Sequence, residues 1–127
     1  HPVTTARIAE ARNRAQEYPR QLAQDSTNYG LSRARVIAER FDTPEQAVAH
    51  FEQQPYEQQS NIEKYGRAVA YELDGRHAEA NRIFTDLIAD DPKVIAYHIG
   101  LGESQFGLED YAAGTATAQC AADHHLR

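Results

Sequence analysis

The side chains best suited to catalysis in this chain are its histidines. There are six of them, at His1, His50, His77, His98, His124 and His125. Hydrolysis by a zinc enzyme commonly requires two histidines one helical turn apart, with a glutamate between them that activates water. No His-Glu-x-x-His segment is present, and the adjacent pair beside Asp123 is better explained as an exposed tail. We therefore predict no metal site.

Paired carboxylates and closely spaced glycines suggest two further chemistries, acid–base catalysis and phosphate binding. The pairs Asp90-Asp91 and Glu109-Asp110 fall at expected helix junctions, where acidic residues commonly cap or flank turns. The Gly100-x-Gly102 segment lacks the third glycine of a dinucleotide-binding loop and has no Lys-Ser or Lys-Thr after it. We expect neither a catalytic residue nor a cofactor.

The composition is that of one folded domain covering residues 1–127. The hydrophobic fraction of 41% is ordinary for a globular protein, and the net charge of −6 gives no basic surface for nucleic acid. No apolar run is long enough to cross a bilayer, so we expect no membrane insertion. Cys120 is the only cysteine, which excludes an intrachain disulfide, and we expect it in the core.

The apolar residues recur at intervals of three and four, which predicts helices and no sheet. Thr43 can cap a helix that has Pro44 in its first position, and the Asp74-Gly75 pair suits a tight turn. We predict that Pro19, Pro55 and Gly107 separate one helix from the next. The expected helices are seven, at about 5–18, 22–41, 44–54, 58–73, 77–90, 95–106 and from 111 onward.

Small and aromatic residues repeat along the chain with a period of about 34. A shift of 34 pairs Gly66 with Gly100, Ala68 with Gly102, His77 with Tyr111 and Ala80 with Gly114, and a shift of 33 pairs Ala47 with Ala80 and Phe51 with Phe84. Small residues are needed where helices approach closely, and rings fill the space between stacked pairs. The spacing predicts stacked helical hairpins, and an unrelated helical bundle is the alternative.

The residues expected to pack the repeats are Ala47, Phe51, Ala68, Tyr71, Gly75, His77, Ala80, Phe84, Pro92, Gly102, Tyr111 and Gly114. Those of them that lie in 60–93, together with Tyr65, fall where the tetratricopeptide repeat family places its aromatic, small, turn and terminal proline residues. The chain therefore resembles that family, with its best repeat at 60–93. Lys64 and Arg67 depart from the family pattern. The resemblance implies an all-α right-handed solenoid of antiparallel hairpins, with N-terminal helices at 5–41, a degenerate half-repeat at 43–59 and a degenerate final repeat at 94–123.

His1-Pro2, the Arg- and Ala-rich segment 7–15, and the segments 29–34 and 65–68 carry a closer resemblance, which covers roughly residues 1–119. In these segments the chain resembles the repeat domain of bacterial beta-barrel assembly-enhancing proteases. This resemblance implies a zinc peptidase domain ahead of His1, a periplasmic location and docking on the outer-membrane assembly machinery or its clients. The absence of methionine is typical of a processed chain or of a piece of a longer one.

In a fold of this kind the first helices of successive hairpins line a concave groove. The residues we expect there are Tyr29, Arg33, Val36, Arg40, Tyr65, Val69, Glu72, Ile99 and Glu103. Tyrosine and valine offer apolar contact, and the arginines and glutamates offer charge selection, which suits a peptide or helix of a partner protein. The alternative is that these residues pack between helices or between subunits and do not bind a partner.

Three functions remain open from the sequence. A non-catalytic module that binds another protein is the first, and it fits the resemblance. A structural dimerisation unit is the second, because a solenoid cut between repeats exposes an apolar end that predicts either self-association or further repeats downstream. A hydrolase acting alone is the third, and it would require a cluster of titratable residues in one pocket, which the sequence does not supply.

Overall fold

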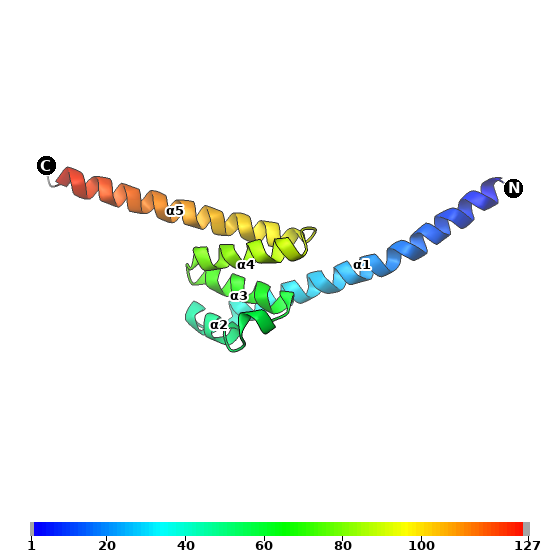
Figure 1. Cartoon of the computed structure of the whole chain (residues 1–127), viewed down its shortest axis with the longest axis horizontal. Coiled ribbons are helices and arrows are strands. Elements are labelled where there is room, and N and C mark those ends of the chain that lie inside the picture. The colour runs from blue at the N-terminus through cyan, green and yellow to red at the C-terminus, as the bar shows by residue number, and fades with distance from the viewer. Residues whose placement is uncertain (1, 126–127) are drawn as a thin grey trace.

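The structure is a computed structural model that describes residues 2–125 of the chain and the side chains of residues 4–110. This part contains five α-helices, one 3-10 turn and no strand, so the all-helical prediction is confirmed. The elements in chain order are α1 (Pro2–Arg40), α2 (Pro44–Phe51), η1 (Tyr56–Gln58), α3 (Asn61–Leu73), α4 (His77–Asp90) and α5 (Ile95–His125). Figure 1 shows α2, α3 and α4 in the body of the molecule, with α1 and α5 leaving it on opposite sides.

The prediction of seven helices is wrong, because two expected breaks lie inside continuous helices. Pro19 lies within α1. A proline removes one backbone hydrogen bond but does not reverse the chain, and the residues that follow it, Arg20, Gln21 and Leu22, are good helix formers. Gly107 lies within α5, where a Cβ would meet the ring of His77. That glycine therefore permits a close approach between α5 and α4 rather than a turn.

The expected fourth helix begins three residues later than predicted. The Oγ atom of Ser60 accepts a hydrogen bond from the backbone N–H of Glu63 at 3.2 Å, which caps α3 and leaves the preceding residues in η1. The predicted cap between α1 and α2 and the predicted turn between α3 and α4 are present. Thr43 Oγ1 accepts from Gln46 N–H at 3.3 Å with Pro44 in the first position of α2, and Gly75 has φ of +76° between α3 and α4.

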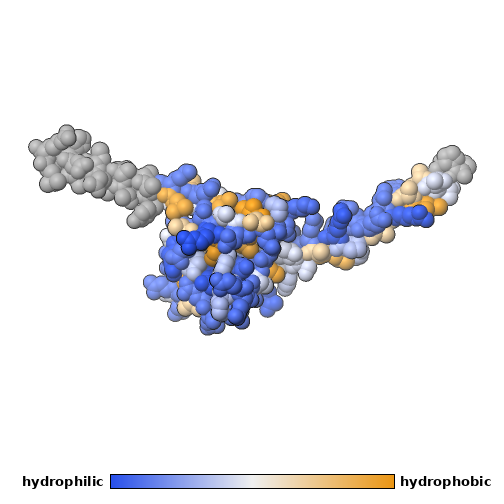
Figure 2. Space-filling view, in the orientation of Figure 1, coloured by the Kyte–Doolittle hydropathy of each residue, from blue (hydrophilic) through white to orange (hydrophobic). Residues whose placement is uncertain are grey.

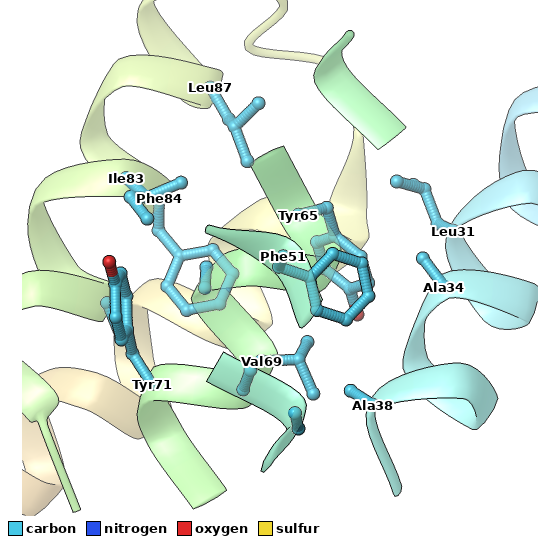
Figure 3. Close-up of a cluster of buried hydrophobic side chains, with 14 of the residues drawn as sticks. Leu31, Ala34, Ala38, Phe51, Tyr65, Val69, Tyr71, Ile83, Phe84 and Leu87 are labelled. Carbon is cyan, nitrogen blue, oxygen red and sulfur yellow. The ribbon is translucent and has the colours of Figure 1, made fainter. Parts of the chain in front are cut away.

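The helices pack in chain order around one core. Neighbouring helices contact one another from α1 to α5, and α3 contacts α1, α2, α4 and α5. The core side chains shown in Figure 3 include Leu31, Ala34, Ala38, Phe51, Tyr65, Val69, Tyr71, Ile83, Phe84 and Leu87. One contact occurs twice: a Cβ at Gly66 of α3 would meet the Phe51 ring of α2, and a Cβ at Gly100 of α5 would meet the Phe84 ring of α4.

Six of the residues predicted to pack the repeats are buried, and Gly75 is exposed at its turn. Ala47, Phe51, Ala68, Tyr71, Ala80 and Phe84 lie in the core, and His77 is half-buried. Pro92 is exposed in the connection after α4. Gly102 is also exposed and no other element lies within 4 Å of its would-be Cβ, so its predicted role in close packing is wrong. It faces away from α4, whereas Gly100 and Gly107 face toward it. The side chains of Tyr111, Gly114, Cys120, Asp123, His124 and His125, and all of His1, lie outside the described part.

The N-terminal half of α1 is an arm that projects from the body. Residues 4–26 of this helix are all exposed, and large apolar side chains among them include Ile8, Tyr18 and Leu22. Figure 2 shows hydrophobic patches along this arm between hydrophilic surfaces. Within the described part of the chain, no helix combines the length and the apolar character that crossing a membrane requires.

Candidate functional site

The predicted groove residues do not form one continuous surface. Tyr65 and Val69 are buried in the core. Val69, Glu72 and Glu103 line one small cleft, whereas Tyr29 and Arg33 line a separate, larger pocket. The other three, Val36, Arg40 and Ile99, are exposed and line neither of them. The structure thus divides the predicted groove into two sites with different neighbours.

The small cleft, named here the Arg35 site, is formed by Arg35, Val69, Glu72, Leu73, Phe84 and Glu103. Its volume is about 190 Å³, and its residues come from α1, α3, α4 and α5. Buried Val69 and Phe84 form the apolar floor, and half-exposed Leu73 extends this apolar surface to solvent. Charged groups of both signs stand around that floor, an arrangement that can hold an apolar side chain of a partner between charged contacts.

Arg35 is held in place by a residue of the core. Its Nε and Nη2 atoms donate hydrogen bonds to Tyr65 Oη at 3.3 and 3.1 Å, and its Nη1 atom lies 3.7 Å from a carboxylate oxygen of Glu39. Burial of the guanidinium favours its neutral form, but the bond to Tyr65 and the fields of Tyr65, Glu103 and Glu39 outweigh that effect and raise the pKa of Arg35. Arg35 is therefore a fixed positive charge facing Glu103.

The acidic side of the Arg35 site is anchored by a histidine. Glu72 Oε1 lies 2.9 Å from His77 Nδ1, and the same His77 ring packs against Gly107 of α5. This contact joins the end of α3, the start of α4 and the middle of α5. A predicted packing residue, His77, thus positions a predicted groove residue, Glu72.

The larger pocket, named here the α1–α2 pocket, has a volume of about 600 Å³, within the range of small-molecule and peptide-anchor sites. It opens between α1, the C-terminal end of α2, the connection that follows and the start of α3. Its lining residues are Ser26, Tyr29, Gly30, Arg33, Ala34, Ile37, His50, Phe51, Gln53, Gln54, Gln59, Ile62 and Glu63. None of these residues lines the Arg35 site.

A set of polar contacts joins the residue that follows α2 to α3, and joins η1 to α4. Tyr71 donates to Glu52 at 2.7 Å and accepts from Arg67 at 3.2 Å, and Tyr56 donates to Asp86 at 2.9 Å. Burial, followed by these bonds to carboxylates, raises the pKa of both tyrosines. Both phenols therefore stay protonated and keep donating at physiological pH. Arg67, which departs from the repeat pattern, is a structural member of this network.

Two residues of the Arg35 site escaped the sequence interpretation, Arg35 itself and Leu73. Arg35 follows Leu31 by four residues and precedes Ala38 by three, so it shares a face with two core residues. That spacing predicts that Arg35, rather than its exposed neighbour Val36, faces the other helices. Leu73, the last residue of α3, follows Val69 by four residues, so its place on the apolar face could be predicted from the sequence, whereas its exposure beside this site could not.

Within residues 4–110 no group of three His, Cys, Asp or Glu side chains is placed to hold a metal ion. Comparison with protein-family models, with curated proteins and with solved structures finds no match to this chain.

Proposed function

We propose that this chain is a non-catalytic module that binds another protein through the Arg35 site. The observation that carries the proposal is the convergence of four helices on an apolar floor, Val69 and Phe84, bordered by Arg35 on one side and by Glu72 and Glu103 on the other. Such a surface has the two elements of a protein-binding site, an apolar contact and charges that select the partner.

We further propose that the helices form a short right-handed solenoid of the tetratricopeptide type. The recurrence of a phenylalanine on a glycine, Phe51 on Gly66 and Phe84 on Gly100, supports this arrangement because the two contacts are 33 and 34 residues apart. The residues that resemble beta-barrel assembly-enhancing proteases support a more specific role. In that role the chain is the repeat part of a periplasmic zinc metallopeptidase and docks on the outer-membrane assembly machinery or its clients.

A substitution at Leu73 tests the binding role without touching the buried floor. In Leu73→Asp, a carboxylate replaces an apolar side chain that is half exposed at the end of α3, so partner contact should be lost while the core remains. We expect affinity for a purified outer-membrane barrel-assembly complex to fall at least about tenfold, equivalent to about 1.4 kcal/mol. Biolayer interferometry with the full chain immobilised measures the change.

Ile95→Asp is the matched control, because Ile95 is an exposed apolar residue that lies outside the Arg35 site. It should bind within about twofold of the unaltered chain, a change of about 0.4 kcal/mol. Circular dichroism melts establish that both variants are folded. Equal affinities of Leu73→Asp and Ile95→Asp would contradict the role of the Arg35 site, and no binding by the unaltered chain would remove the assembly machinery as the partner.

Self-association is the second candidate, favoured by the exposed arm of α1. Ile8, Ala11, Ala15, Tyr18 and Leu22 follow one another at intervals of three and four, the spacing of a coiled-coil seam. Arginines at 7, 12 and 14 flank that seam, so two copies of the arm would bring like charges together. Sedimentation velocity at increasing concentration separates the candidates, because a monomer throughout excludes the dimerisation unit.

A further inference from the structure

The α1–α2 pocket exists because α2 is shorter than its counterpart α4. A shift of 33 residues places Ala47 on Ala80 and Phe51 on Phe84, and all four side chains are buried. Helix α2 ends at Phe51, whereas α4 continues beyond Phe84 to Asp90. The hairpin of α1 and α2 therefore lacks the last turns that the hairpin of α3 and α4 possesses.

The missing turns leave the place of one leucine unfilled. Continuing the shift of 33 places Gln54 on Leu87, and Leu87 is 1% exposed in the core. Gln54 is exposed and stands at the edge of the α1–α2 pocket. From this shift we infer that the α1–α2 pocket corresponds to the space that Leu87 fills, because a glutamine in an irregular segment stands where α4 has a leucine.

The walls of this pocket are formed in advance by contacts within the chain. Gly30 and Ile62 approach closely at its base, and Ala34 and Phe51 provide buried apolar surface. Gln59 Nε2 donates to the Phe51 carbonyl at 2.6 Å, which fixes the polar wall. A ligand would thus meet an apolar site that needs little rearrangement, which favours binding.

The positive charge of Arg33 at the mouth of the pocket favours a ligand that carries a negative charge. Arg33 is an exposed lining residue, and the described part of the chain provides no ion pair or hydrogen bond for its guanidinium. The acidic lining residue, Glu63, is engaged with Ser60 at the start of α3, with its Oε1 atom 3.2 Å from Ser60 Oγ. A carboxylate on the ligand therefore has a free cationic partner at the mouth.

We propose that the α1–α2 pocket binds a peptide segment of a partner protein that presents a leucine-like side chain next to a carboxylate. The aliphatic group occupies the position that corresponds to Leu87, and the carboxylate pairs with Arg33. This site is additional to the Arg35 site, from which it differs in every lining residue.

Three short peptides test the proposal on the full chain. They are acetyl-Ala-Leu-Asp-amide, acetyl-Ala-Leu-Lys-amide and acetyl-Ala-Ala-Asp-amide, titrated while backbone amide shifts are followed by NMR. We expect the Leu-Asp peptide to shift amides of 26–37 and 50–63 and to bind at least about fivefold more tightly than either of the others. Similar affinity for all three peptides, or shifts confined to other residues, would overturn the proposal.

Variants of the chain separate the contribution of the Arg33–carboxylate pair from that of the aliphatic side chain in the pocket. Arg33→Glu should remove the preference for Leu-Asp over Leu-Lys, whereas Arg40→Glu, an exposed arginine on the same helix that does not line the pocket, should retain it. Gln54→Leu should fill the pocket from within and weaken binding of the Leu-Asp peptide at least about fivefold. An unchanged preference in Arg33→Glu would refute the proposal.

Two further measurements distinguish peptide binding in this pocket from binding at the Arg35 site and from self-association. Leu73→Asp should bind the Leu-Asp peptide as the unaltered chain does, because Leu73 lies at the Arg35 site, so either site can fail while the other stands. Shifts of the same pocket amides on dilution of the free chain would assign the pocket to a second copy of this chain and overturn the peptide assignment.

Discussion

Replacing Phe84 with alanine is expected to lower the free energy of unfolding by about 3–5 kcal/mol. The side chain is 1% exposed, and its ring packs against Gly100 and lies 6.0 Å from the Tyr65 ring. Truncation removes the apolar burial of the ring and leaves a cavity among α3, α4 and α5. Because a domain is commonly stable by about 5–15 kcal/mol, the loss is a large share of the total. Urea unfolding followed by circular dichroism measures it.

Phe106→Ala provides the matched comparison, because the same atoms are removed from a ring that is 72% exposed on α5. We expect a change within about 0.5 kcal/mol for this surface site. Equal losses in the two variants would show that Phe84 does not belong to the core described for it. A Phe84→Leu variant, which keeps much of the volume, should fall between the two and remain folded if Phe84→Ala does not.

The glycines at 100 and 102 should respond in opposite directions to alanine. A Cβ at Gly100 would fall on the ring of Phe84, which is buried and cannot move aside, so Gly100→Ala should cost about 1–3 kcal/mol. Among the described residues, nothing outside its own stretch of α5 lies within 4 Å of a Cβ at Gly102. Gly102→Ala should therefore stabilise the chain by about 0.5–1 kcal/mol, because glycine is a poor helix former.

Both variants lie in one helix two residues apart, so differences in helix propensity cancel between them. Thermal and urea denaturation of the two proteins side by side give the sign of each effect. Gly66→Ala is a second test of the same contact, because its Cβ would meet the Phe51 ring in the preceding hairpin. Stabilisation by Gly100→Ala would mean that α4 and α5 are farther apart than described.

The effects of Gly66→Ala and Gly100→Ala together test whether the hairpins stack in the same way. If Gly66→Ala and Gly100→Ala both destabilise, the ring-on-glycine contact is a repeated element of the interface between hairpins. The proposed solenoid requires such equivalence, since each pair of helices shields the apolar side of the next. A closed bundle does not require the same ring-on-glycine contact at Gly66 and at Gly100.

The type and many of the bounds of the helices could be predicted from local patterns. Thr43 with Pro44, and Gly75 with a positive φ, mark their junctions through backbone chemistry that involves only nearby residues. The breaks expected at Pro19 and Gly107 could not be judged in the same way. Gly107 permits contact with His77, thirty positions away, and nothing next to it in sequence distinguishes that role from a turn.

The candidate sites were predicted less completely than the helices. Val69, Glu72 and Glu103 do line one cleft, but Tyr29 and Arg33 line another, and Arg35 was missed. The reason is rotation about the axis of α1. Arg33 and Arg35 are two residues apart, which turns their side chains about 200° from each other on a helix, so they face different neighbours.

By itself the sequence determined that the chain is helical, where several helices start and which small and aromatic residues recur. Those properties depend on hydrogen bonds and apolar spacing within a few residues. Only the tertiary structure decided that α1 and α5 are continuous, that Gly100 rather than Gly102 meets a ring, and that the short α2 leaves a pocket beside Arg33. These outcomes depend on the length and orientation of the helix packed alongside, and local periodicity carries no information about that neighbour.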